Sequence, residues 1–318
     1  MPLEIMNSKN RFVLSTFFFA LLVGVAYGRN VVVATSDNTL TNVPFWVGIE
    51  KRLFQQAGIT IDYVLMRSDL AAKGLITGDV DYMQSVSSVM RAGAAGVSTV
   101  VLFGTFNRTF FELVARPEIR SLPDLKGKVI AISRYGASTE YAVRFGLKAN
   151  GIDPDREVKL LAFGASAPRI SALYKGLAAA SVLQVPENFV AQKLGAHTIL
   201  SLGQYLETLL SGVGASRRKV EENRDEVKRL LRGLVKSIVY MADHRSETVE
   251  IIQKRLAGID RNVAEYIYAL VTKHVTKDGI PSEKALRNTL LGTPFEGKVA
   301  GFEKLADFSI AREVADEK

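Results

Sequence analysis

The sequence predicts an α/β protein made of two similar, Rossmann-like lobes with a ligand cleft between them. Apolar strand-like runs alternate with amphipathic helical stretches, which favours mostly parallel sheets covered by helices on both faces. The same order of elements also occurs twice, and glycines that suit helix ends recur in both copies at nearly constant separation. The paired glycines are Gly58 and Gly151, Gly78 and Gly176, and Gly96 and Gly195.

The first copy begins with the strand VVVAT at 31–35, followed by a polar loop. A helix is predicted from Pro44 to Gly58, because apolar residues recur every four positions and proline is favoured in a first helical turn. Alternating apolar residues predict a strand at 59–63. A short helix ending at Gly78, a second helix ending at Gly96 and a strand at 98–106 complete the copy.

The second copy repeats this order. The run 128–132 is a predicted strand, 133–139 is a loop, and an apolar face from Tyr141 to Ala149 predicts a helix. Further predicted elements are a strand at 157–163, a helix at 170–174, a strand at 180–185, a helix at 186–194 and a strand at 197–202. Helices expected at 220–243, 247–256, 263–275 and 282–291 have no counterpart in the other copy. We expect them to pack on a lobe that is already formed.

Composition narrows the class of protein. The chain has 318 residues and a formal net charge of +8, but its Lys and Arg residues form no stripe interleaved with aromatics, so nucleic acid is not an expected partner. The chain has no cysteine, which excludes disulfides and thiolate metal sites. Near the N-terminus, Lys9 and Arg11 precede an apolar run of about 16 residues, shorter than a membrane span. Small residues follow it, so we expect a cleavable signal peptide at 1–28 and a periplasmic location.

The loops after the strands are the expected ligand site, because ligands of open parallel sheets bind at the carboxyl ends of the strands. A helix start of small residues such as 136–139 can present backbone N–H groups to an anion. Acidic residues in the same loops leave the charge of the ligand open. The candidate ligand-binding residues are Ser36, Asp37, Asn38, Trp46, Gln84, Ser85, Asn107, Arg108, Arg134, Tyr135, Gly136, Ala137, Ser138, Thr139, Phe163, Gly164 and Glu187.

Motifs for catalysis or cofactor binding are not found. The three histidines are far apart and lack metal-ligand spacing, and neither lobe carries a nucleophile elbow, a phosphate loop or a dinucleotide fingerprint. We therefore expect no metal, no cofactor and no enzymatic activity.

Several stretches resemble the type II periplasmic solute-binding proteins of ABC importers, specifically the nitrate/sulfonate/taurine group related to thiamine-precursor synthase. They are FWVGIEKRLFQQAGI, GDVDYMQS, SLPDLKGKVIAISRYGAST, LKANGI, ALYKGLAAASVL and VPENFVAQKLGA. The resemblance implies that two crossovers, near 107–113 and 209–213, join the lobes. It divides the chain into the signal peptide at 1–28, lobe 1 at 29–108, lobe 2 at 109–210, and a return to lobe 1 with C-terminal helices at 211–318.

The resemblance also implies a function. A monomer would bind a small organic solute, either sulfonate-, nitrate- or taurine-like or pyrimidine-like, close by a hinge movement and deliver it to the transmembrane permease subunits. Two alternatives remain open. One is a lyase or dehydratase that acts on a small carboxylate in the same cleft, because a fold does not fix a function. The other is a periplasmic ligand sensor.

Overall fold

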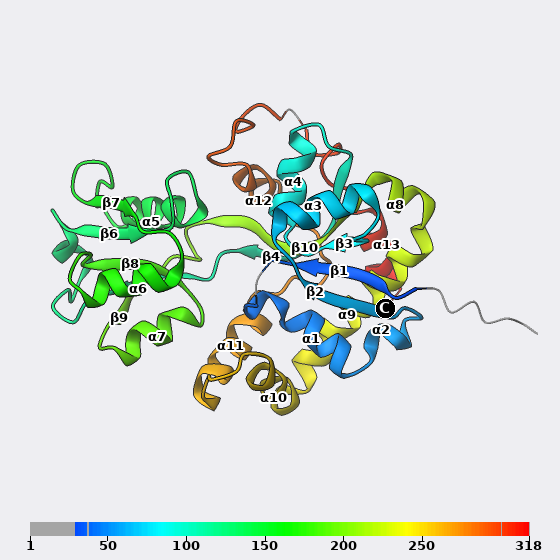
Figure 1. Ribbon diagram of the computed structural model, residues 1–318, viewed down its shortest axis with the longest axis horizontal. Helices are drawn as coiled ribbons and strands as arrows, with labels where there is room; N and C mark the ends of the chain where they lie inside the picture. Colours follow the sequence, from blue (N-terminus) through cyan, green and yellow to red (C-terminus); the bar gives the residue numbers. More distant parts are fainter. Residues whose placement is uncertain (1–28, 37, 300, 318) are drawn as a thin grey trace, which may run out of the picture.

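The computed structural model describes residues 29–36, 38–299 and 301–317 (Figure 1). The predicted signal peptide, 1–28, lies outside these residues. Within them, no helix has both the length and the apolar character needed to cross a membrane.

Strands within the described residues form two five-stranded sheets, one in each lobe. The lobe 1 sheet has the order β2-β1-β3-β10-β4, and the lobe 2 sheet has the order β7-β6-β8-β5-β9. The strands of lobe 1 are β1 (Val31–Thr35), β2 (Ile61–Leu65), β3 (Tyr82–Met83), β4 (Thr99–Arg108) and β10 (Glu207–Ser216). Those of lobe 2 are β5 (Phe111–Ala115), β6 (Val129–Ile132), β7 (Lys159–Ala162), β8 (Ala180–Gln184) and β9 (His197–Ser201).

The two sheets share one topology. In lobe 1, β1 pairs with β2 and β3 in parallel, while β10 runs antiparallel to β3 and β4. In lobe 2, β6 pairs with β7 and β8 in parallel, while β5 runs antiparallel to β8 and β9. The inverted strand of each sheet is the one that enters from the other lobe, because strands joined by a crossover helix within a lobe stay parallel. The repeated order of elements in the sequence therefore corresponds to a repeated fold. Each sheet is mixed, with two parallel and two antiparallel pairings, and not mostly parallel as predicted, because the strand from the other lobe enters in the opposite direction.

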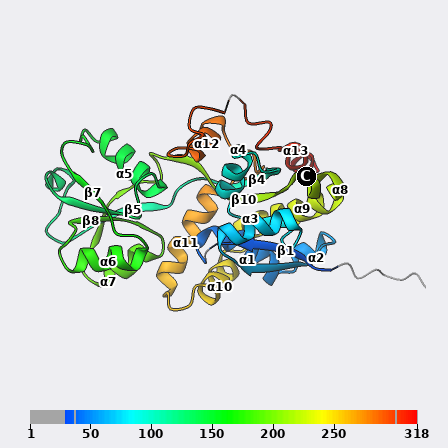
Figure 2. The ribbon, with the colours of Figure 1, turned by 45° about the horizontal axis from the view of Figure 1, so that its top comes forward.

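Helices cover both sheets (Figure 1, Figure 2). Those of lobe 2 are η2 (Leu122–Leu125), α5 (Ser138–Ala149), α6 (Ser166–Tyr174) and α7 (Glu187–Lys193). The first part of lobe 1 contributes η1 (Leu40–Asn42), α1 (Val43–Glu50), α2 (Leu53–Gln56), α3 (Ser68–Thr77) and α4 (Val86–Ala94). The return segment adds α8 (Arg217–Glu222), α9 (Arg224–Asp243), α10 (Arg245–Arg255), α11 (Arg261–His274), α12 (Glu283–Thr289) and α13 (Ser309–Asp316).

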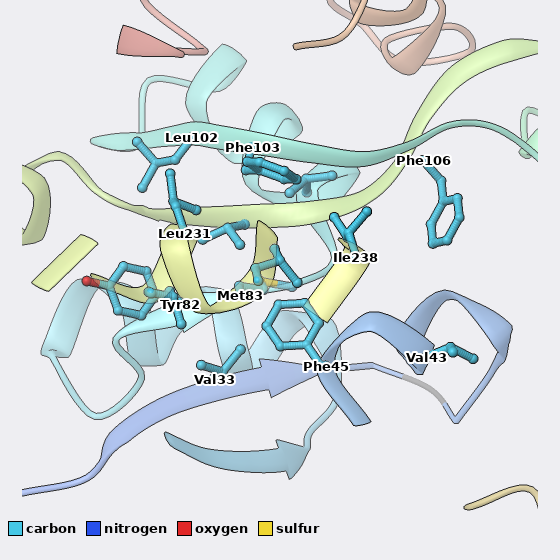
Figure 3. Close-up of a cluster of buried hydrophobic side chains, with 14 of the residues drawn as sticks. Val33, Val43, Phe45, Tyr82, Met83, Leu102, Phe103, Phe106, Leu231 and Ile238 are labelled. Carbon is cyan, nitrogen blue, oxygen red and sulfur yellow. The ribbon is translucent and has the colours of Figure 1, made fainter. Parts of the chain in front are cut away.

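The core of lobe 1 explains why the return helices belong there. Figure 3 shows Leu231 and Ile238 of α9 among side chains from β1, β3 and β4 and from α1. Gly48 of α1 and Gly233 of α9 both face the Phe54 ring so closely that a Cβ on either glycine would collide with it. The small residues let α1, α2 and α9 approach one another. The extra helices lie on lobe 1 as predicted, but α9 forms part of its core and does not merely pack on a lobe that is already formed.

Two predicted helices are each broken in two. The helix expected up to Gly58 stops at Glu50 and resumes at Leu53, because Arg52 has a left-handed backbone with φ of 55°. This turn directs the Phe54 ring against the two glycines of α1 and α9. The helix expected at 220–243 is interrupted at Asn223, where φ is −135°. In both places the spacing of apolar residues continues across the break, so periodicity alone does not reveal it.

The chain passes to lobe 2 between β4 and β5 and returns between β9 and β10 (Figure 1). The return occurs at 202–206, earlier than the predicted 209–213, because β10 already pairs with β4 at Glu207. The two crossovers touch, since a Cβ on Gly203 would collide with the carbonyl oxygen of Thr109. The predicted division at 210/211 falls inside β10, and the domain limits stay a prediction.

Candidate functional site

Two adjoining cavities lie where the lobes meet, and together they form what we call the cleft. The first, of about 220 Å³, is lined mainly by lobe 1, and the second, of about 150 Å³, by both lobes. The first is lined by Thr35, Ser36, Thr39, Thr41, Ser68, Gln84, Ser85, Ser87, Ser88, Arg91, Gln184, Leu210 and Ser211. The second is lined by Ser87, Arg91, Arg134, Gly136, Ala137, Ser138, Tyr141, Leu206, Thr208, Leu209, Leu210, Asn288, Thr289 and Leu291.

Strand ends position most of the polar lining. Ser36 follows β1, Gln84 and Ser85 follow β3, and Arg134 follows β6, so the carboxyl ends of parallel strands in both lobes face the cleft. Strand β10 supplies a further wall through Thr208 and its neighbours. The general location of the site thus follows from the sheet topology.

Two arginines from different lobes face the cleft. Arg91, on α4, is half-buried, and Arg134, in the loop after β6, is exposed. Burial, and then the positive charge of Arg134, lower the pKa of the Arg91 guanidinium. Among the described residues, Arg91 donates a single long hydrogen bond of 3.4 Å, to Ser87 Oγ. Within 29–36, 38–299 and 301–317, neither arginine forms an ion pair, so the cleft contains two cationic groups without a paired carboxylate.

Hydroxyl and amide groups surround these charges. Ser36 and Ser85 hydroxyls lie 2.7 Å apart, and the Gln84 amide nitrogen donates to the Thr41 carbonyl at 2.8 Å while its carbonyl oxygen accepts from Tyr63. These bonds fix the polar wall of lobe 1. Ser211 Oγ is buried and has no hydrogen-bond partner among the described residues, which suits a group that bonds to a ligand or to water.

The start of α5 is less open to a ligand than predicted. Gly136, Ala137 and Ser138 do line the cleft, but the Gly136 N–H already donates to the Glu140 carboxylate at 2.6 Å. An anion at this helix start would compete with that carboxylate for the amide. Thr139 is buried and its hydroxyl oxygen accepts from the Ser133 N–H at 3.1 Å, so it supports the loop from inside.

Other candidates lie away from the cleft. Trp46 is only 2% exposed because it fills the core of lobe 1, so its ring offers no stacking face. Tyr135 turns back to lobe 2, where its hydroxyl donates to the Leu160 carbonyl at 3.0 Å. Asn38 donates to the Arg255 carbonyl at 3.1 Å.

The remaining candidates serve lobe 2 or the crossovers. Phe163 packs on a small apolar cluster, and the Gly164 carbonyl accepts from Arg169. Burial lowers the pKa of Arg169, and the nearby charge of Glu187 offsets part of this lowering. Asn107 is absent from the cleft lining, and Arg108 lines a separate cavity. Asp37 lies outside the described residues.

Sequence reasoning missed Arg91, Tyr141 and the α12 residues Asn288 and Thr289. The sequence could have predicted the position of Arg91 in the cleft, because Arg91 lies one helical turn after Ser87 on a helix that begins at a strand end. No sequence pattern predicted that the α12 residues line the cleft, since they reach it only because the chain returns to lobe 1. Among the described lining residues Tyr141 is the only aromatic, and none is a carboxylate or a histidine. The described residues also contain no cluster of side chains able to hold a metal ion.

Comparisons with known proteins agree with this architecture. No match was found among curated protein sequences. Solved structures with the same fold include the periplasmic aliphatic sulphonate-binding protein SsuA from Escherichia coli, with 16% identity, TM-score 0.65, and 78% of this chain and 85% of that chain covered. The periplasmic nitrate-binding protein NrtA from Synechocystis PCC 6803 has 11% identity, TM-score 0.65, and coverage of 91% and 88%.

A ligand-binding component of an ABC-type import system from Staphylococcus aureus, solved with zinc bound, has 12% identity, TM-score 0.69, and coverage of 90% and 99%. These likenesses establish the two-lobed fold. The model of the family described as NMT1/THI5 like matches residues 40–248, which is more than half of the chain. This protein therefore belongs to the NMT1/THI5-like family.

Proposed function

We propose that this protein is the extracytoplasmic solute-binding subunit of an ABC importer and that it binds a small organic anion in the cleft. One observation carries the proposal: Arg91 of lobe 1 and Arg134 of lobe 2 face the same cavity, and neither has an ion-pair partner among the described residues. Two like charges near each other are unfavourable unless an anion joins them.

The lining favours a polar, non-aromatic ligand. Serine and threonine hydroxyls dominate the first cavity, and Tyr141 is the only aromatic among the described lining residues of the cleft. A sulfonate or carboxylate carried on a short aliphatic chain suits this surface better than a pyrimidine, which needs a stacking face. The titles of SsuA and NrtA, which name sulphonate and nitrate, agree with an oxyanion.

The two arginines also suggest how binding drives closure. An anion held by Arg134 on lobe 2 attracts Arg91 on lobe 1, so the liganded protein gains a bond across the cleft that the free protein lacks. The closed form would then be recognised by membrane permease subunits. Delivery to a sensor receptor instead of a permease is distinguished by deleting the gene: loss of solute uptake supports import, and loss of a response alone supports sensing.

Binding is favoured over turnover because the described lining offers no carboxylate or imidazole for acid–base chemistry. We expect calorimetry with short alkanesulfonates, carboxylates, nitrate and pyrimidines to find a micromolar anionic ligand that mass spectrometry recovers unchanged. A ligand that is consumed would favour the cleft enzyme instead.

Charge removal tests the site itself. Each of R91Q and R134Q should weaken binding of that anion by about 10- to 100-fold, the usual worth of a hydrogen bond to a charged group. The matched control is R156Q, because Arg156 is exposed on lobe 2 and outside the cleft. Equal affinity in all three variants, or preferred binding of a pyrimidine, would overturn the proposed site.

A further inference from the structure

A third cavity, of about 310 Å³, lies at the crossovers and shares no lining residue with the cleft. Both crossovers and α11 form its walls, and we call it the crossover cavity. It is lined by Arg108, Thr109, Phe110, Glu112, Ser201, Gly203, Gln204, Tyr266, Leu270, Lys273 and His274. Figure 2 shows α11 on the side of lobe 1 that faces lobe 2.

Two cationic side chains and one carboxylate, that of Glu112, line this cavity. Arg108 comes from β4 and Lys273 from α11, and neither forms an ion pair within the described residues. The acid opposite Arg108 is Glu207 on β10, but its carboxylate accepts from Ser282 and lies 3.8 Å from Lys284. Glu207 therefore bonds to the start of α12, and no ion pair joins it to Arg108 among the described residues.

The acid inside the cavity is also occupied. One carboxylate oxygen of Glu112 accepts from the Tyr266 hydroxyl at 2.7 Å, and the other accepts from Asn188 at 2.7 Å and Thr198 at 2.6 Å. Glu112 thus joins lobe 2 to α11. Its charge remains in the cavity, but within the described residues it forms no ion pair with Arg108 or Lys273.

The pKa of His274 reflects the positive charge in this cavity. Burial, followed by the charges of Arg108 and Lys273, lowers the pKa of its imidazole to about 4. Lys273 and His274 lie in the last turn of α11, where the helix dipole favours positive charge. That effect does not account for Arg108, which comes from a different element.

We propose that the crossover cavity binds a small inorganic oxyanion of the size of sulfate, held by Arg108 and Lys273 with Ser201 and Gln204 as hydrogen-bond donors. The cavity has room for several water-sized groups, and its two cations converge from β4 and α11. Because its walls include both crossovers, this second site lies at the segments that a movement of the lobes would deform.

The test uses His274 as a local probe in the full-length mature chain. The protein is titrated with sodium sulfate against sodium chloride at constant ionic strength, and the imidazole signal, assigned with H274Q, is followed by NMR at several pH values. An oxyanion beside Arg108 and Lys273 adds negative charge near His274, which shares the cavity with Glu112. The pKa of His274 should therefore rise in sulfate by about one unit. The chloride series should leave it unchanged.

Variants separate this site from the cleft. R108Q and K273Q should each abolish the sulfate-dependent change in the His274 signal, while K277Q, an exposed neighbour outside the cavity, should retain it. The double cleft variant R91Q/R134Q should also retain the sulfate-dependent change. The result at the crossover cavity is therefore independent of whether the cleft binds the proposed solute. No sulfate-dependent change in the parent chain, or the same change in R108Q and K273Q, would overturn the proposal.

Discussion

His274 makes the stability of this protein sensitive to pH. Its ring packs near Phe110, with ring centroids 6.2 Å apart, and its pKa is lowered from 6.5 to about 4 by burial and by Arg108 and Lys273. Between pH 6.5 and 4 the unfolded chain therefore binds a proton that the folded chain does not. The stability that His274 contributes is complete above pH 6.5 and is lost as pH falls through this window.

We expect this loss to be about 2 kcal/mol between pH 7 and pH 4, after allowance for the partial exposure of the ring. Urea unfolding at pH 7, 5.5 and 4.5 measures it. H274Q should lessen the pH dependence relative to the parent chain, whereas H197Q, on β9 and outside the crossover cavity, should keep it. Equal slopes for the two variants would contradict the prediction.

At the scale of residues, sequence reasoning located the cleft better than it assigned its members. The rule of strand carboxyl ends led to Ser36, Gln84, Ser85 and Arg134, which do line the cleft. The same rule could not tell which way a side chain turns after the strand, so Tyr135 was included although it bonds within lobe 2. Whether the lining residues bind a ligand stays a prediction.

Among the elements, α12 and the turn after it connect lobe 1 to lobe 2. Gly292, just beyond α12, has φ of 68°, and a Cβ there would lie 2.6 Å from the Tyr141 hydroxyl and 2.7 Å from the Gly136 carbonyl oxygen. Both contacts belong to the start of α5 in lobe 2. The glycine therefore permits the close approach that forms one wall of the cleft.

Gly292→Ala should lower the free energy of unfolding by about 1 to 3 kcal/mol more than Gly297→Ala. Gly297 is a matched control because its φ is also 68° but a Cβ there meets nothing within 4 Å. The two variants share the cost of a left-handed alanine and differ only in the collision with lobe 2. Urea unfolding of both variants measures the two losses in free energy of unfolding. Equal losses would contradict the prediction, because they would mean that the turn at Gly292 moves to accommodate the Cβ without loss of stability.

Local signals predicted most elements but not the breaks between them. Positive φ at Gly58, Gly78 and Gly96, and at the paired glycines of lobe 2, agrees with the helix ends that the sequence indicated. The break at Arg52 could not be foreseen, because an arginine with a left-handed backbone is stabilised by the packing of Phe54 and not by its own preference. Helix α13 was also missed.

At the scale of the whole molecule, the chain builds its lobes differently. Every strand and helix of lobe 2 lies within 109–206, and its buried clusters draw their members from that segment. Lobe 1 needs both parts of the chain, since β10 lies between β3 and β4 in its sheet and α9 packs on α1 and α2. One lobe is thus a continuous insertion into the other.

This difference predicts different behaviour of fragments. The segment 109–206 contains its complete sheet, so we expect it to fold alone, with cooperative urea unfolding and dispersed NMR signals. It should be less stable than in the intact protein, because Glu112 loses Tyr266 and Val185 loses the lobe 1 core against which it packs.

The fragment 29–108 is the matched control. It lacks β10 and α9, so the two-residue strand β3 loses a neighbour and Phe54 loses its cover, and it should stay unfolded. A folded 29–108 would mean that lobe 1 does not need its return segment, and an unfolded 109–206 would mean that lobe 2 depends on lobe 1.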